Sequence, residues 1–467
     1  MSFTPVSSRW SDVWLVTAAR GLSSCGDFLA AAALTLALQT AGAGGLAVSG
    51  LLLAATLPLV ALAPLTGRLA DRVDSRTLLV VAGVAQAGIC LALAYTDSPP
   101  LVIVLVGLLA VGLAVTQPVL AALVPAMVRP ADLPRASALH QSAGTLGALA
   151  GPALAGLLVG GFGTRVPLLV DAVSYLALVA AGLLIRTRRG GRRRAQPAAT
   201  GTTADGRTPA GWRLRSDPLL LAMVVSVAGV VGAVGAINVV EVFFIRETLH
   251  STTTMYGLVT GAWTLGMLAG AWIFARVVRR FPQDAALTRA TLALLGGCCL
   301  MVLVSAAVPS ALLLVPIWLI GGVWNGGNNV FGNVLMARRV PEAARGRAFA
   351  IYGGAVQGAA MVGYLAGGLL LEFFAPRPLV AVAGVAGLVA VALLVIPVNR
   401  AARAERSGPA EHAERSGPAE HAERSGPADR AEGVVRPELA GPDRSEQGER
   451  SGLSAPDAGL ATPAPGR

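Results

Sequence analysis

The stretch Gly67–Arg76, GRLADRVDSR, places five charged side chains in ten positions of a chain that is 54% hydrophobic and only 13% charged. Long apolar runs precede and follow it. Soluble globular proteins carry about 25% charged residues. An apolar run of about 20 residues can cross the hydrocarbon core of a bilayer as a helix, which satisfies its own backbone hydrogen bonds. The stretch is therefore a polar connection between two membrane spans.

Working outward from this connection gives twelve apolar runs bounded by glycine, proline or charge. They predict an all-α integral membrane protein with twelve transmembrane helices, arranged as two pseudo-symmetric six-helix bundles. The predicted spans are 12–39, 46–66, 76–95, 100–127, 135–161, 166–186, 217–246, 254–280, 285–307, 311–338, 345–374 and 378–398.

The arginines give the expected orientation, because cytoplasmic connections are rich in Lys and Arg. Every basic residue of the chain is arginine. If the N-terminus is inside, the inner segments before residue 400 hold 23 arginines, and the outer connections hold only Arg165, Arg246 and Arg377. We expect a multi-pass protein of the cell inner membrane with both termini in the cytoplasm. Topology thus accounts for the basic charge, and we expect no nucleic-acid partner.

Composition divides the chain into four parts. The basic segment 187–216 is a cytoplasmic linker between an N-terminal bundle, 1–186, and a C-terminal bundle, 217–399. From 400 to 467 the chain is poor in apolar residues and repeats AERSGPAEH with a period of nine from Ala404. A segment of this composition buries too little apolar surface to fold, so we expect a disordered cytoplasmic tail.

The two bundles share a weak internal repeat. Segment 67–79 resembles segment 275–287, and Arg68 and Arg72 align with Arg276 and Arg280. Two equivalent bundles can rock around a central site, which is the architecture of alternating-access transporters.

The connection 67–76 carries a family resemblance. It resembles the loop between helices 2 and 3 of major facilitator superfamily transporters, although Asp74 stands where that family usually has glycine. The resemblance implies that the carboxylate of this motif docks on the start of the eleventh helix, near Arg345, when the cytoplasmic side is closed. Such a contact would act as a conformational latch. The latch residues would be Gly67, Arg68, Asp71, Arg72 and Arg76.

A second resemblance points to exporters. GALAGPALAG in the fifth span is similar to the glycine–proline signature of drug:proton antiporters, at Gly147, Gly151, Pro152 and Gly156. SSCGDFLAAAALTLAL in the first span and LVDAVSYL in the sixth resemble the group that includes enterobactin and macrolide efflux pumps. Glycines at this spacing allow close helix packing, and the proline allows a bend.

Ionisable residues at bilayer depth are expensive and therefore functional candidates. Asp27, Asp171 and Glu241 are the candidates for proton coupling. Arg20 lies two helical turns before Asp27 on the same face, so water or a substrate group could bridge the two. The alternative for the acids is a structural hydrogen bond between helices.

Amide side chains predict the cavity wall. Asn325, Asn328 and Asn329 share one face of the tenth span, and close helix packing is the alternative explanation for them. The family resemblance places this span at the central cavity. Trp324 could stack on an aromatic substrate, while Gln117 and Asn238 are polar candidates in the fourth and seventh spans.

These features predict a secondary transporter that exports a small, largely apolar organic molecule in exchange for protons, without a bound cofactor. The sequence holds no GxxxxGK[ST] loop for nucleotide hydrolysis and no Cys/His cluster for a metal. A nutrient importer, a membrane enzyme and a non-transporting sensor are the alternatives. We expect a monomer in the lipid bilayer.

Overall fold

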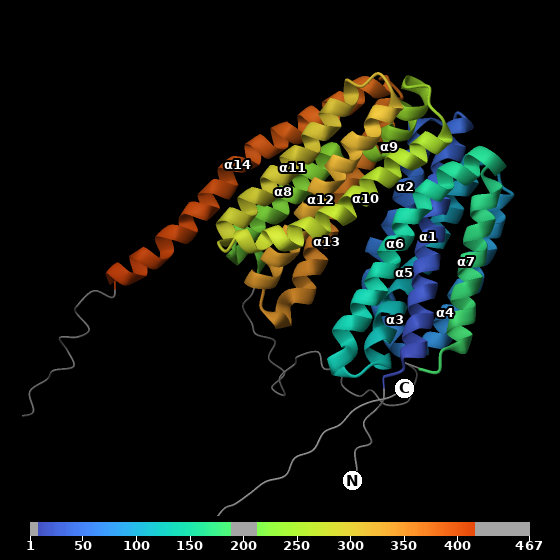
Figure 1. The fold of residues 1–467 in the computed structure, drawn as a ribbon, viewed down its shortest axis with the longest axis horizontal. Helices are drawn as coiled ribbons and strands as arrows, with labels where there is room; N and C mark the ends of the chain where they lie inside the picture. The colour runs from blue at the N-terminus through green and yellow to red at the C-terminus, as the bar shows by residue number, and fades with distance from the viewer. Residues whose placement is uncertain (1–7, 188–212, 416–467) are drawn as a thin grey trace, which may run out of the picture. The chain divides into compact units, whose positions relative to one another are not determined.

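The computed structural model describes residues 8–187 and 213–415, and these residues form helices joined by short connections (Figure 1). The N-terminal half contains α1 (Trp10–Thr40), α2 (Gly44–Ala61), α3 (Ala63–Arg72), α4 (Ser75–Ala94), α5 (Pro99–Met127), α6 (Leu133–Phe162) and α7 (Arg165–Leu184). The C-terminal half contains α8 (Pro218–Val234), α9 (Ile237–Phe243), α10 (Thr253–Val277), α11 (Asp284–Ala306), α12 (Ala311–Arg339), α13 (Glu342–Leu371) and α14 (Pro376–Arg415). Three short 3₁₀ turns and one π-helical turn, η3 (Phe244–Thr248), complete the described chain.

The predicted number of membrane spans is confirmed. Within the described ranges, twelve helical segments are long and apolar enough to cross a membrane, from Trp10–Thr40 to Pro376–Arg403. All twelve lie in one compact unit that extends to Gly408. Most of the linker expected at 187–216 and the tail beyond Arg415 lie outside the described residues.

The predicted end of the second span at residue 66 is wrong, because the chain stays helical to Arg72. The second span breaks instead at Leu62, between Pro58 and Pro64, and continues as α3 to Arg72. Proline is well tolerated in the first turn of a helix, so Pro64 begins a new helix where it would disturb an old one. The turn falls at Val73 and Asp74, and the Asp74 carboxylate accepts a hydrogen bond from the Arg76 backbone N–H at 2.9 Å. Asp74 is therefore the N-cap of α4.

The last helix also differs from its predicted end. We expect an unfolded tail from residue 400, whereas α14 continues to Arg415 and includes the first nine-residue repeat. An existing membrane helix removes the cost of nucleation, so Ala404, Glu405 and Arg406 can extend it, whereas Gly408 and Pro409 of the same repeat disfavour the helix.

The two halves meet through equivalent helices. In the N-terminal half α1 packs on α6 and α7, and in the C-terminal half α10 packs on α12 and α13 packs on α8. Between the halves, α2 contacts α13 and α6 contacts α10. In both pairs the second span of one half meets the fifth span of the other, as pseudo-two-fold symmetry requires.

The hydrogen bonds recorded between the halves, for the described side chains, all lie near one face. This arginine-poor face carries the connections 41–43, 95–98, 163–164, 249–252, 307–310 and 372–375. The bonds link Gln39 with Arg246 and Glu247, the Leu46 N–H with Glu372, Ser49 with the Tyr364 carbonyl, and Thr254 with the Gly156 carbonyl.

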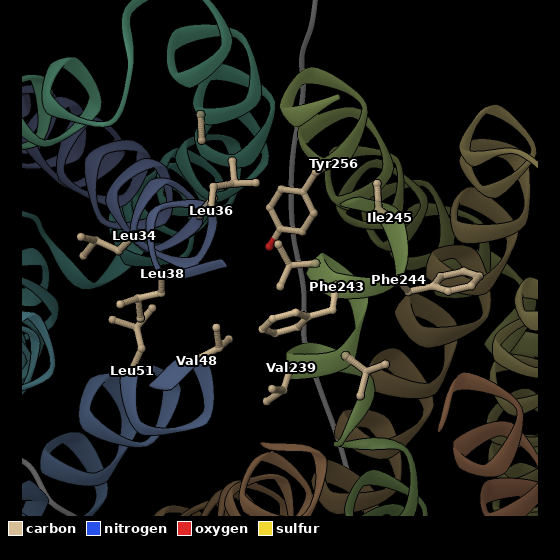
Figure 2. Packing of buried hydrophobic residues seen from close by; sticks show 14 of the residues in the cluster. Leu34, Leu36, Leu38, Val48, Leu51, Val239, Phe243, Phe244, Ile245 and Tyr256 are labelled. Atoms are coloured by element: carbon tan, nitrogen blue, oxygen red, sulfur yellow. The ribbon is translucent and has the colours of Figure 1, made fainter. Parts of the chain in front are cut away.

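Apolar packing joins the halves at the same level. Figure 2 shows Leu36 and Val48 of the N-terminal half facing Tyr256, Phe243 and Val239 of the C-terminal half. These side chains belong to one buried cluster. In this conformation the halves are therefore closed together at the arginine-poor face.

An ion-pair network joins helices of the C-terminal half at the ends that lie away from the arginine-poor face. Arg339 at the end of α12 donates to Asp217 at 2.7 Å and to Asp284 at 3.3 Å. Asp217 also caps α8 by accepting from the Leu220 N–H at 3.0 Å. The Arg339 side chain is 20% exposed, whereas neighbouring Arg338, at 3.4 Å from Asp284, is 35% exposed.

Arg339→Ala is expected to destabilise the fold by roughly 3 kcal/mol, because it leaves two partly buried carboxylates without their shared cation. Arg338→Ala, which removes a longer and more exposed pair, should cost less than about 1 kcal/mol. Thermal unfolding of both variants in the same detergent measures the difference. Equal loss of stability in the two variants would contradict this account of the network.

Candidate functional site

Asp27 lies at the wall of an apolar pocket within the N-terminal half. The pocket is bounded by α1, α2 and α5, and Asp27 is the one polar residue among those that line it. The remaining walls come from alanine, leucine and valine side chains such as Leu51 and Val106. A single carboxyl group in an apolar pocket of about 70 Å³, smaller than the roughly 300 Å³ of typical ligand pockets, suits a proton site.

Tyr175 holds the Asp27 carboxylate in place. This side chain comes from α7, is fully buried, and its hydroxyl donates a hydrogen bond to Asp27 Oδ1. Asp27 is not enclosed, since its side chain keeps partial exposure. One end of the pair is therefore fixed in the protein interior, while the carboxylate itself can meet a ligand or water.

Asp171 lies one helical turn before Tyr175 on α7 and is fully buried. Its carboxylate accepts hydrogen bonds from Ser174 Oγ at 3.0 Å and from Cys90 Sγ on α4 at 3.2 Å. Gly26 lets α1 approach this group, because a methyl there would overlap Asp171 Oδ1 and Ser174 Oγ. The structure thus brings Asp27 and Asp171 into one polar cluster, which we call the α1–α7 cluster: Asp27, Cys90, Asp171, Ser174 and Tyr175.

Sequence reasoning missed the three partners that join these carboxylates. Cys90, Ser174 and Tyr175 look like ordinary residues of apolar helices. The available signal was the i, i+3, i+4 spacing of Asp171, Ser174 and Tyr175, which puts three polar groups on neighbouring positions of one helix face.

Arg20 lies beside α6 on the N-terminal side of the α1–α7 cluster. Its guanidinium packs against Gly144, and it makes no hydrogen bond or ion pair with the residues that the structure describes. It is close enough to interact electrostatically with Asp27 and with His140 of α6. His140 Nδ1 and Thr17 Oγ1 are buried polar atoms without a hydrogen-bond partner in the same part of the chain.

Glu241 is buried in α9 and is separate from the α1–α7 cluster. Its carboxylate accepts one hydrogen bond, from Thr260 Oγ1 at 3.3 Å. No hydrogen bond recorded for the described side chains joins it to Asp27 or Asp171. Asn238, one turn earlier, is exposed and donates to the Gly235 carbonyl at 3.2 Å. Asn238 and Glu241 therefore have different hydrogen-bond partners in this conformation.

The asparagine stripe of α12 divides into two parts. Asn329 is exposed and its Nδ2 donates to Asn325 Oδ1 at 3.2 Å. Asn328 is buried, and its Oδ1 has no hydrogen-bond partner within the described chain. Trp324, one turn before Asn328, packs on α11, where a methyl at Gly297 would overlap its ring. Trp324 thus fills a helix contact, and Asn325 and Asn329 are the amides left to face a ligand.

The glycine–proline motif of α6 has two packing faces. A methyl on Gly147 would overlap the Gly21 carbonyl of α1, and one on Gly151 would lie 2.9 Å from the Cys25 carbonyl. On the other face, Gly156 meets Gly257 of α10, and the Pro152 carbonyl lies beside the same residue. The motif therefore joins α6 to α1 within one half and to α10 of the other half.

For Gln117 and the predicted latch residues, the structure records few contacts that bear on the site. Gln117 is half-buried in α5 and makes no hydrogen bond with the described residues. The structure gives the backbone at Gly67, Arg68 and Asp71 but does not describe the side chains of Arg68 and Asp71, so the docking of Asp71 stays a prediction. Arg72 ends α3 with an exposed side chain, and Arg76 lies in the first turn of α4.

Asp12 is a further buried acid that sequence reasoning did not single out. Its carboxylate accepts hydrogen bonds from the Thr187 N–H at 3.0 Å and from Thr187 Oγ1 at 2.7 Å. Both bonds tie the start of α1 to the end of α7. Both hydrogen bonds reach Asp12 Oδ2, so this carboxylate has a structural role in joining the two helices.

Comparison with known families decides the classification of this helical, two-half architecture. The family model described as transmembrane secretion effector matches residues 2–428. The chain belongs to this family of major facilitator transporters. No curated protein sequence matches the transporter.

Solved structures agree with the fold of this secretion effector family member. The nucleoside transporter NupG, in a substituted form, superposes with a TM-score of 0.66 at 13% identity, covering 83% of this chain and 99% of that one. A bacterial homologue of the iron transporter ferroportin in an inward-facing state gives 0.64 at 18% identity, covering 84% and 100%. A bacterial homologue of the human lysosomal transporter Spinster, inward-facing and unoccupied, gives 0.61 at 15%, covering 87% and 98%.

Proposed function

We propose that this transporter exports a small, largely apolar organic molecule from the cytoplasm in exchange for protons, by alternating access. The observation that carries the proposal is the position of Asp27, an ionisable group at the wall of an otherwise apolar pocket inside the membrane. A carboxylate that binds a proton in one state and a ligand in another couples the two fluxes, because each lowers the occupancy of the other.

The α1–α7 cluster supports a role in proton movement. Two carboxylates lie in one buried cluster, and the groups that hydrogen-bond to them are hydroxyl and thiol side chains. Among the described residues, neither carboxylate forms a salt bridge. Each carboxylate can therefore change its charge without breaking an ion pair of the fold. Glu241 is a second, separate candidate in the C-terminal half.

The closed arginine-poor face supports the direction of access. With the arginine-rich ends in the cytoplasm, as the positive-inside rule predicts, the closed face is the outer one. An exporter must pass through such a state to take up its solute from the cytoplasm. We further propose that the protein works as a monomer in the inner membrane, with both termini in the cytoplasm and the proton gradient as its only energy source.

A flux assay with purified protein tests this function. The transporter is reconstituted in liposomes with an internal pH-sensitive dye and an imposed pH gradient, and a panel of hydrophobic antibiotics and metabolites is added. We expect at least one compound to dissipate the gradient only when the protein is present, and to be expelled from cells that overproduce it. A compound that accumulates in such cells instead would support import and contradict the proposal.

A further inference from the structure

A second pocket lies at the arginine-poor face of the N-terminal half. The ends of α1, α4, α5 and α7 enclose it, and all of its lining residues fall between Leu34 and Leu168. Its rim is polar, and its deeper walls are apolar. The rim groups are Thr40, Thr96, Asp97, Thr164 and Arg165. Asp97 is exposed, and the Arg165 guanidinium lies 5.7 Å from the centre of the Tyr95 ring. We call this the outer pocket.

Leu34 lines both the outer pocket and the pocket of Asp27. The two helices that bound both pockets show the same order. On α1, Leu38 lines the outer pocket, Leu34 lines both, and Asp27 lines only the deeper one. On α5, Val102 lines the outer pocket and Val106, one turn later, lines the deeper one. The pockets are therefore stacked along the helix axes, with Leu34 at the boundary.

We propose that Leu34 is the plug of a proton-access path that runs from the arginine-poor face, through the outer pocket, to the Asp27 carboxylate. This inference rests on the proposed role of Asp27 in proton coupling. Asp27 lies seven residues from Leu34, which is about 10 Å along a helix at 1.5 Å per residue. A single buried leucine between two pockets is an apolar constriction of the kind that stops water and protons by dewetting.

The path does not depend on separation of the two halves. Every residue that lines the outer pocket belongs to the N-terminal half, whereas the contacts that close the arginine-poor face join one half to the other. Leu34 therefore has to hold its position while Asp27 is open to the opposite side. Otherwise protons would pass from one face to the other without substrate.

Leu34→Ala in proteoliposomes tests the plug directly. In the absence of any substrate, we expect its passive proton permeability to exceed that of the wild type by roughly tenfold or more, since a truncated side chain lets the constriction wet. The double variant Leu34→Ala/Asp27→Asn should return to the wild-type rate, because the path leads through that carboxylate.

Leu36→Ala is the matched control. It makes the same truncation in the same helix at an equally buried position, but Leu36 lines neither pocket and points away from Leu34 toward Tyr256 (Figure 2). A leak of equal size in Leu36→Ala, no leak in Leu34→Ala, or a leak that persists in the double variant would each overturn the proposal.

Thiol labelling gives a second measurement that does not depend on the leak. With the four native cysteines replaced by serine, Leu34→Cys should react with a membrane-impermeant thiol reagent applied from the arginine-poor face, and Leu36→Cys should not. Equal labelling of both positions, or of neither, contradicts the path. These assays need no substrate, so failure of the plug is distinguishable from failure of substrate-coupled proton exchange in the wild type.

Discussion

Gly156→Leu is expected to lower transport severely while leaving each half folded. A β-carbon added at Gly156 would lie 2.8 Å from the Thr253 carbonyl oxygen and 3.0 Å from Gly257 Cα. Both atoms belong to the backbone of α10, so no side chain can rotate away to relieve the overlap. Overpacking of roughly 1–3 kcal/mol at this contact would lower the population of the closed arginine-poor face about 5- to 150-fold. A transporter that rarely reaches one of its two states turns over in proportion.

Gly161→Leu is the matched control for this variant. Gly161 lies at the end of the same helix, and no atom would lie within 4 Å of an added β-carbon. Spin labels at Asp97 and Phe373, which are exposed on opposite halves of the arginine-poor face, would report the distance between the halves. We expect a longer distance and little transport in Gly156→Leu, and wild-type values in Gly161→Leu. Wild-type transport in Gly156→Leu would show that this contact does not limit closure.

Asp27→Asn is expected to reduce substrate-driven proton flux to the level of empty liposomes. Asparagine keeps the shape of the side chain and an oxygen that can accept the Tyr175 hydrogen bond, but it cannot take up a proton. The fold and the apolar pocket should survive, so exchange of labelled for unlabelled substrate, which needs no net proton movement, should persist. The pair of measurements separates coupling from binding.

Two further variants locate the coupling group. Asp97→Asn alters an exposed acid and should leave flux near the wild-type value. Asp171→Asn alters the fully buried member of the α1–α7 cluster, whose carboxylate is engaged by Ser174 and Cys90. If Asp27→Asn retains proton-coupled flux and Asp171→Asn loses it, the coupling role belongs to Asp171 and our assignment to Asp27 is wrong.

The twelve spans could be predicted from the sequence because each depends only on residues that are neighbours along the chain. Span length is set by bilayer thickness, and the arginines mark alternate connections. Local breaks were harder to predict. The interruption at Leu62 and the capping role of Asp74 depend on proline and aspartate acting within one or two turns, at positions where apolar composition continues unchanged.

The candidate site was predictable only residue by residue. Asp27 and Asp171 stand out because an acid at bilayer depth is costly, but their union in one cluster depends on the packing of α7 and α4 against α1. For the asparagine stripe, the sequence pattern grouped residues that the fold separates. Helical periodicity correctly groups Asn325 with Asn329, yet it also includes Asn328, which is buried and separate from their hydrogen bond.

The seventh span is interrupted and is not one continuous helix, since α8 ends at Val234 and α9 begins at Ile237. Gly235 at this interruption packs against Gly363 of α13. The side-chain amide of Asn238 donates a hydrogen bond to the Gly235 carbonyl. The short segment beyond it carries Glu241, Arg246 and Glu247, and the last two residues bond across to Gln39. Residues that close the arginine-poor face therefore lie on a short segment joined to α8 through this interruption, and not on one uninterrupted helix.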